Sequence, residues 1–164
     1  MAAKQSASDL TEAYQRPATP ADVRYLADNM RANDVAEIKA QSGNTPEESL
    51  LHSFFASKPC MAMVGRHGQL MGMWGVVPRG FKSGQIWMLC TDDMVKDKHD
   101  RRTFLRKSKQ QLALLFKDYS VLFNVVDARN AVHVRWIRHM GFTFVAKHPE
   151  WGPENRLFFE FVRI

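Results

Sequence analysis

The stretch Asn130–Phe142, NAVHVRWIRHMGF, is the part of the chain that decides its fold class. Asn130 follows a strand-like apolar run and precedes a segment whose apolar residues recur at helical spacing. Gly141 ends the predicted helix, because glycine readily adopts the left-handed conformation found after a helix C-terminus. Phe142 then begins another apolar run. The stretch therefore predicts a strand, a helix and a strand in immediate succession.

Apolar periodicity divides the rest of the chain into further helices and strands. Thr19-Pro20 and Thr45-Pro46 are helix starts, each with an N-cap residue followed by proline at the first helical position. Asn33 or Asp34 is expected to cap a helix between them. The predicted helices are 19–30, 34–41, 45–55, 97–119 and 130–140. The predicted strands are 13–16, 60–65, 69–77, 85–91, 121–126, 142–147 and 156–162, with a polar loop at 148–155.

This order of elements predicts an α/β (α+β) fold with a mixed central sheet flanked by helices. The strand at 121–126 should run parallel to the strand at 85–91 and splay from it, with the helix at 97–118 connecting the two. Residues 1–12 are small and polar and are predicted to form a flexible tail, so the single domain spans 13–164.

The composition allows one globular domain. The chain has 164 residues, of which 45% are hydrophobic, which suffices for a sizeable core and excludes three or more domains. Cys60 and Cys90 stand in apolar, strand-like contexts, and we predict buried, reduced thiols. The N-terminal region holds no apolar signal segment, and no apolar run approaches the roughly 18–20 residues that span a bilayer. We therefore expect synthesis in a reducing cytoplasm and no membrane span.

The segment at 130–142 resembles the last helix and strand of the GNAT (N-acetyltransferase-like) fold, which often reads NxxAxxLYxxxGF. Asn130, Gly141 and Phe142 match that pattern. The order of elements also agrees with a GNAT domain over about residues 13–163. The resemblance implies a single-domain, GNAT-like mixed sheet, and it implies acetyl-CoA as the cofactor of those members that are enzymes.

Two features that GNAT enzymes use are missing from this sequence. Ile137 occupies the position that usually carries the catalytic Tyr, and an alkyl side chain cannot protonate a leaving thiolate. The family's phosphate loop, [QR]-x-x-G-x-[GA], is replaced by DDMVKDKHDRRT at 92–103, which lacks the glycines that let backbone N–H groups approach a pyrophosphate. We therefore predict no catalytic residue and no cofactor. Only a degenerate anion site remains, made of Asp92, Lys96, Lys98, Arg101 and Arg102.

The sequence is also similar to small phage proteins grouped with the internal virion protein A of T7-like podoviruses. Four segments carry this similarity: D-x-x-E-I-x-A at Asp34–Ala40, Thr91-Asp92 at a strand end, FLRKSK at Phe104–Lys109 and H-x-R-[WF]-[IL] at His133–Ile137. The similarity implies a virion protein made in the host cytoplasm. Its partners would be other virion proteins (portal, tail or inner-core subunits) within a multimeric particle.

The chain carries 23 basic and 17 acidic residues, a net charge of +6. Two interpretations stay open: a basic surface that keeps the protein soluble, or contact with nucleic acid, an acidic cofactor or an acidic protein surface. Four basic side chains fall on one side of the helix at 97–119, because their spacing follows the helical repeat. We call this set the basic arc and predict that it is the interaction surface, for an acidic partner subunit or for non-specific contact with DNA: Lys98, Arg102, Arg106 and Lys109.

Other candidate residues are weaker. His133 or His139 with an Asp orienter, Asp127 or Asp92, is one arrangement for acid-base chemistry, and packing is the other interpretation of these histidines. The four Trp and nine Met residues are expected to fill the core rather than to line a ligand groove. No Cys/His spacing typical of zinc is present, so the sequence predicts no metal site.

Together these features favour a phage virion-associated structural protein over an enzyme. We expect it at the inner core or at the portal-tail junction, acting in assembly or genome delivery without catalysis. The alternative is a CoA-dependent N-acyltransferase with a degenerate phosphate-binding loop. A third interpretation is a small binding module that retains the pocket without turnover.

Overall fold

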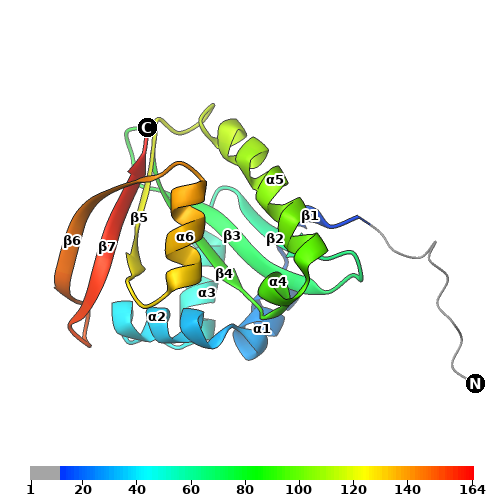
Figure 1. Ribbon diagram of the computed structural model, residues 1–164, viewed down its shortest axis with the longest axis horizontal. Helices are drawn as coiled ribbons and strands as arrows, with labels where there is room; N and C mark the ends of the chain where they lie inside the picture. The colour runs from blue at the N-terminus through cyan, green and yellow to red at the C-terminus, as the bar shows by residue number, and fades with distance from the viewer. Residues whose placement is uncertain (1–11) are drawn as a thin grey trace, which may run out of the picture.

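Seven strands form one mixed sheet in the order β1-β2-β3-β4-β5-β7-β6 in the computed structural model, which describes residues 12–164 (Figure 1). The strands are β1 (Tyr14–Pro17), β2 (Cys60–Val64), β3 (Leu70–Pro78), β4 (Ser83–Cys90), β5 (Val121–Asp127), β6 (Thr143–Trp151) and β7 (Arg156–Arg163). The helices are α1 (Pro20–Asn29), α2 (Ala32–Ser42), α3 (Pro46–Ala56), α4 (Asp93–Lys96), α5 (Lys98–Leu115) and α6 (Ala131–His139). The predicted mixed sheet flanked by helices is confirmed.

The parallel pair β4 and β5 lies at the centre of the sheet, and every other strand pair is antiparallel. The parallel ladder is short: it joins 83–85 to 121–123 and then stops. Beyond Gln85 and Phe123 the two strands diverge, and we call the wedge between them the V. The predicted parallel, splayed arrangement is therefore confirmed.

Asn124 stands at the point of divergence and replaces the missing ladder bonds with its side chain. Its Nδ2 donates to the Ile86 carbonyl oxygen at 2.7 Å, and its Oδ1 accepts from Gln85 Nε2 at 3.1 Å. The same Oδ1 accepts the Val125 backbone N–H at 2.8 Å. Buried backbone groups require hydrogen-bond partners, and the Asn124 amide supplies them where the two central strands diverge.

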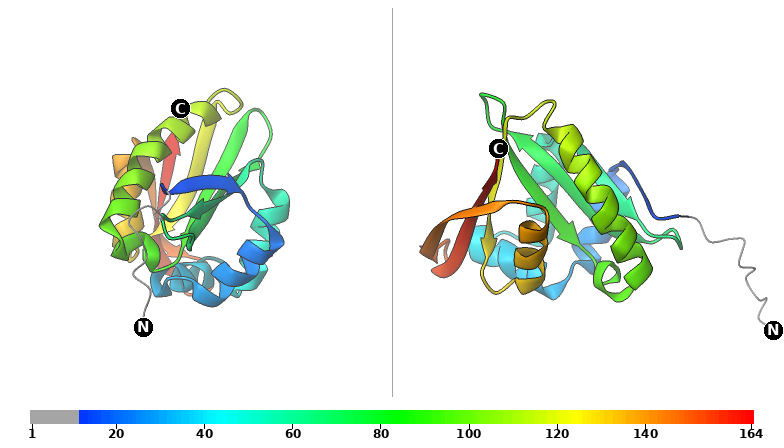
Figure 2. Two further views of the ribbon diagram at one scale, coloured as in Figure 1. Left: turned by 90° about the vertical axis from the view of Figure 1, so that its right-hand side faces the viewer. Right: turned by 45° about the horizontal axis from the view of Figure 1, so that its top comes forward.

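Helices cover both faces of the sheet (Figure 2). On one face α1 and α3 bury Val23, Leu26 and Leu50 against Ala62 and Met73. On the other face α5 and α6 supply much of the larger core through Phe104, Leu112, Leu115 and Ile137. These positions recur at helical spacing, which explains why apolar periodicity located the helices.

Two of the predicted helix starts are confirmed, and one is wrong. Thr19 and Thr45 each form a capping box with the acidic residue three positions on, followed by proline. Neither Asn33 nor Asp34 caps α2, which begins at Ala32 without a side-chain cap. Asp34 is instead fully buried and turned toward β4, so its carboxylate serves tertiary structure rather than its own helix.

Several element bounds also differ from the prediction. The predicted polar loop at 148–155 is wrong, because β6 continues to Trp151 and only 152–155 form the turn. Its alternating pattern is polar because β6 is an edge strand, where half of the side chains meet solvent. The predicted helix at 97–119 ends at Leu115, after which the chain turns toward the β3–β4 hairpin through a Ser120 N–H to Lys82 carbonyl bond. The predicted tail lies outside the described residues, except for exposed Glu12.

The β6–β7 turn packs directly on α2, and Gly152 permits this approach. Gly152 has φ +69°, and a Cβ atom there would overlap the Ala40 carbonyl oxygen. Gly152→Ala should therefore lower the free energy of unfolding by about 3 kcal/mol or more, measured by chemical denaturation. Gly68 is the matched control, since its φ is +78° and a Cβ atom there would meet no described atom within 4 Å, so Gly68→Ala should cost only about 1 kcal/mol. Equal losses at both positions would show that the α2 contact contributes nothing.

Candidate functional site

Polar residues from three segments meet at the open end of the V. α2 and the residue before it, the end of β4, and the start of α6 all contribute. We call this group the polar cluster: Arg31, Asp34, Glu37, Cys90, Asn130 and His133. The sequence segments at Asp34–Ala40 and His133–Ile137, which lie far apart in the chain, therefore come together here.

Asp34 is the centre of the polar cluster. It is 0% exposed, and its Oδ2 accepts the Cys90 backbone N–H at 2.9 Å. Its Oδ1 accepts from Asn130 Nδ2 at 3.0 Å and from the Arg31 guanidinium at 3.2 Å. A buried carboxylate is stable only when paired and hydrogen-bonded, and removing one partner of a buried ion pair typically costs about 3–5 kcal/mol. Asp34 therefore holds α2, β4 and α6 together.

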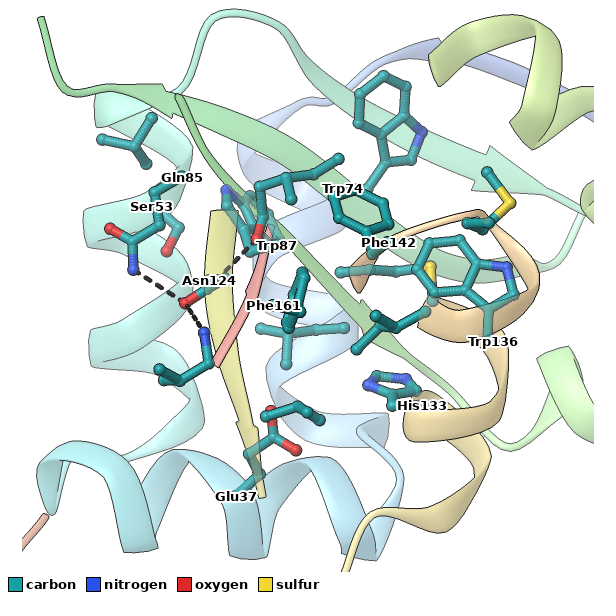
Figure 3. Close-up of a pocket in the computed structure, with 18 of the residues that line it drawn as sticks. Glu37, Ser53, Trp74, Gln85, Trp87, Asn124, His133, Trp136, Phe142 and Phe161 are labelled. Atoms are coloured by element: carbon teal, nitrogen blue, oxygen red, sulfur yellow. Dashed lines mark hydrogen bonds between the residues drawn. The ribbon is translucent and has the colours of Figure 1, made fainter. Parts of the chain in front are cut away.

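Glu37 lies one turn further along α2 and points toward the same space as His133 (Figure 3). Its Oε2 accepts from Asn130 Nδ2 at 2.9 Å, so one amide serves both Glu37 and Asp34. Burial, and to a lesser extent the nearby Asp34 carboxylate, raise the pKa of Glu37 to about 8. Glu37 as a whole residue is half-buried, but its carboxyl group is enclosed. The burial of the carboxyl group is what sets its pKa.

His133 and Cys90 are buried groups of the cluster that titrate away from their usual ranges. Burial lowers the pKa of His133, and burial raises the pKa of the Cys90 thiol well above its usual value. His133 Nε2 lies 3.6 Å from Asp34 Oδ1. The predicted orienters of this histidine are wrong, since Asp127 pairs with Arg129 at 2.7 Å and Asp92 is exposed.

A cavity of about 250 Å³ fills the V and is lined from both faces of the sheet. Figure 3 shows its polar and aromatic side chains converging from α2, α3, β4, β5 and α6. Ile137, at the position of the missing Tyr, belongs to this wall and is buried. Within the described chain, Trp136 Nε1 and Ser108 Oγ are buried without a hydrogen-bond partner. The aromatic residues of the wall are Trp74, Trp87, Phe104, Trp136, Phe142 and Phe161. The prediction that the tryptophans only fill the core is therefore incomplete, because three of them line this cavity.

The N-terminus of α5 is occupied by the chain's own carboxylates. Asp97 Oδ1 accepts the backbone N–H groups of Asp100 and His99, at 3.1 and 2.9 Å, and these contacts hold the pKa of Asp97 below its usual range. Asp100 is 0% exposed and accepts the Arg66 backbone N–H at 3.2 Å. Helix N-termini bind anions through free N–H groups, and here the first of those groups are already paired.

The residues predicted for a degenerate anion site lie around this helix start. Asp92, Lys96, Lys98 and Arg102 are exposed, and Arg101 is committed to the Val95 carbonyl oxygen at 3.1 Å. All four residues of the basic arc are exposed on α5, and Arg106 also pairs with Glu12 at 3.7 Å. Their role as an interaction surface stays a prediction.

Solved structures of other proteins have a similar fold. They include a spermidine N-acetyltransferase from Vibrio cholerae in complex with CoA and spermine, at 13% identity, with 93% of this chain and 95% of that chain covered and a TM-score of 0.67. A GNAT-family acetyltransferase from Bacillus anthracis matches at 9% identity, 94% and 96% coverage and TM-score 0.69. A ribosomal-protein-alanine N-acetyltransferase from Brucella melitensis matches at 20% identity, 92% and 99% coverage and TM-score 0.66. At these identities the similarity establishes the GNAT-like fold alone.

A protein-family match provides the closer assignment. The family described as "Bacteriophage T7, probable scaffold protein Gp13" matches residues 70–151, half of the chain. The chain belongs to this bacteriophage protein family. Comparison with curated proteins gave no match.

The Gp13-family match runs from β3 to β6 and covers half of the polar cluster. It includes Cys90, Asn130 and His133 of the polar cluster, together with all of α5. Arg31, Asp34 and Glu37 lie before the matched region, so the cluster joins the Gp13-family core to the N-terminal helices. No helix of residues 12–164 has both the length and the apolar character to span a membrane.

The raised pKa of Glu37 predicts how stability depends on pH. Between its ordinary pKa of 4.5 and the folded value of about 8, the native carboxyl keeps a proton that the unfolded chain has lost. The native state is therefore destabilised as pH rises through this window. The free energy of unfolding of Glu37→Gln, relative to that of the unmodified protein, should increase by about 1–3 kcal/mol as the pH rises from about 5 to about 9. Denaturant titrations with a chelator present measure this, and Glu150→Gln, on exposed β6, serves as the control. A difference independent of pH would contradict the prediction.

Proposed function

We propose that this chain is a phage virion-associated structural protein that uses a GNAT-like domain for assembly rather than for acetyl transfer. Membership of a family described as a probable scaffold protein supports a structural role in the phage particle. The observation that carries the proposal is the N-terminus of α5, where the Asp97 carboxylate accepts the first free N–H groups of the helix, which an anionic cofactor would otherwise use. An internal carboxylate competes with a phosphate through both charge and position.

The four sequence segments that resemble internal virion protein A of T7-like podoviruses support a finer proposal for the location. We propose the inner core or the portal-tail junction, with other virion proteins as partners and with assembly or genome delivery as the role. The basic arc is suited to binding another virion protein, since its four cationic side chains are exposed along α5. It would dock an acidic partner surface or contact DNA without reading sequence.

The alternative is a CoA-dependent N-acyltransferase, and one observation favours it. The cavity in the V is lined from both faces of the sheet, and the V. cholerae enzyme of the same fold is described in complex with CoA and spermine. Two observations argue against this alternative. Ile137 has no acidic proton to donate to a leaving thiolate, and the N–H groups at the start of α5 are already paired with Asp97.

Acetyl-CoA binding separates these two functions. We expect a Kd on the order of millimolar, equivalent to about 4 kcal/mol, because the backbone donors at α5 are already used. Isothermal titration calorimetry measures this. Asp97→Ala is the informative variant, since it frees the His99 and Asp100 N–H groups and should tighten binding if that helix start is the site. A micromolar Kd in the unmodified protein, or acetyl transfer to an amine at enzyme-like rates, would establish the alternative.

The basic arc provides the test of assembly. A variant with Lys98, Arg102, Arg106 and Lys109 all changed to Glu should lose incorporation into phage particles, measured by mass spectrometry of purified virions, and should lower infectivity. Its melting temperature should barely move, because exposed ion pairs contribute at most about 1 kcal/mol each.

The matched control is a second fourfold reversal with the same change in net charge. Four exposed basic residues outside the arc provide it: Arg24, Lys39, Lys117 and Lys147. This control should be incorporated normally. If both variants behave alike, the effect comes from net charge, and if the arc variant is incorporated normally, the arc is only a solvated surface.

A further inference from the structure

Three potential metal ligands of the polar cluster lie close together in the interior. A carboxylate oxygen of Asp34, the thiol sulfur of Cys90 and a ring nitrogen of His133 are all within 4.8 Å of one another. All three residues are buried, at 0%, 1% and 7% exposure. In a tetrahedral zinc site the ligand atoms lie about 2.0–2.3 Å from the ion and so about 3.3–3.8 Å apart. The 3.6 Å between His133 Nε2 and Asp34 Oδ1 already matches this spacing.

The histidine points to a ligand independently of this proximity. The separation of 3.6 Å is too long for a hydrogen bond. Within residues 12–164 the His133 ring makes no hydrogen bond at all, although the residue is only 7% exposed. Asn130 Oδ1 is likewise buried without a partner in the described chain. Buried polar groups are nearly always paired, so an unpaired imidazole that lies beside a carboxylate and a thiol points to a ligand.

The chemistry of the ligands selects the ion. A thiolate, an imidazole and a carboxylate form a set that suits zinc, whereas magnesium and calcium prefer oxygen ligands alone. The Arg31 guanidinium, 3.2 Å from Asp34, opposes a cation, and the negative charges of the Asp34 carboxylate and of a zinc-bound Cys90 thiolate offset it.

An entry path to this position exists. A second cavity, of about 350 Å³, is lined by Arg31, Cys90 and His133 and by exposed His139 at its rim. It is distinct from the cavity in the V, which Glu37 lines and which also reaches His133. An ion can therefore reach Cys90 and His133 from this cavity, and Asp34 lies next to both of them.

We propose that Asp34, Cys90 and His133 form a zinc site that fastens the open end of the V. The ion would join α2, β4 and α6, the same elements that Asp34 already connects through hydrogen bonds. Its role is structural, and the proposal is independent of the function proposed above. The sequence prediction of no metal site rested on local spacing, which does not detect ligands from three distant segments.

Zinc binding to the chelator-treated full chain tests the proposal. We expect one equivalent of zinc bound with a Kd below about 1 µM by calorimetry, and a melting temperature that rises with zinc concentration. Cobalt substitution should give a thiolate-to-cobalt charge-transfer band, which only a cysteine ligand produces. Cys90→Ser should abolish that band and weaken zinc binding by at least about a hundredfold. Cys60→Ser is the matched control and should leave both unchanged, because Cys60 lies outside the cluster.

The outcomes are distinguishable even where a variant fails to fold. If Cys90→Ser is unfolded, His133→Gln and the cobalt spectrum of the unmodified protein decide. Absence of the charge-transfer band in the unmodified protein overturns the proposal, even if zinc binds elsewhere on the surface. It is also overturned if folded Cys90→Ser binds zinc as tightly as the unmodified protein, or if Cys60→Ser loses the band. The cluster is then a purely hydrogen-bonded one.

Discussion

The buried carboxylate of Asp34 is the constraint on which the rest of this structure depends. Two central strands diverge, and divergence leaves their ends without the ladder bonds that neighbouring strands normally share. Asp34 accepts the Cys90 N–H at the end of β4 and the Asn130 amide at the start of α6, so a side chain from α2 closes what the sheet leaves open. Arg31 balances its charge. A hydrophobic residue would pack in the same volume but would orphan these donors.

Asn124 has the corresponding role at the closed end of the V. Its amide bonds both strands at the point where they part, and the cavity lies between Asn124 and the polar cluster. The V is thus a space held open by polar groups at each end and lined by aromatic side chains between them (Figure 3). The existence of such a cavity does not by itself assign a reaction.

What distinguishes this chain is how it treats charge around α5. The N–H groups at the start of α5, an anion-binding position in many proteins, are paired with Asp97, while the basic arc is exposed along the same helix. The exposed positive charge of α5 is therefore on the surface, while the start of the helix is paired within the chain. This arrangement is compatible with the family described as a probable scaffold protein.

Local signals in the sequence determined much of this protein. The capping boxes at Thr19 and Thr45, the turn at Gly141 and apolar periodicity gave the element order, because each depends on neighbouring residues only. Tertiary structure decided the site. Asp34 and Asn130 have the residue types of helix caps. Asp34 lies inside α2, and Asn130 is at the N-cap position of α6, but neither side chain makes a capping hydrogen bond, since both bond across the fold instead. The neighbouring residues do not determine whether such a side chain caps its helix or bonds to a distant segment. Residues that lie tens of positions apart also form no recognisable sequence motif. Their proximity arises only when the splayed sheet brings α2, β4 and α6 together.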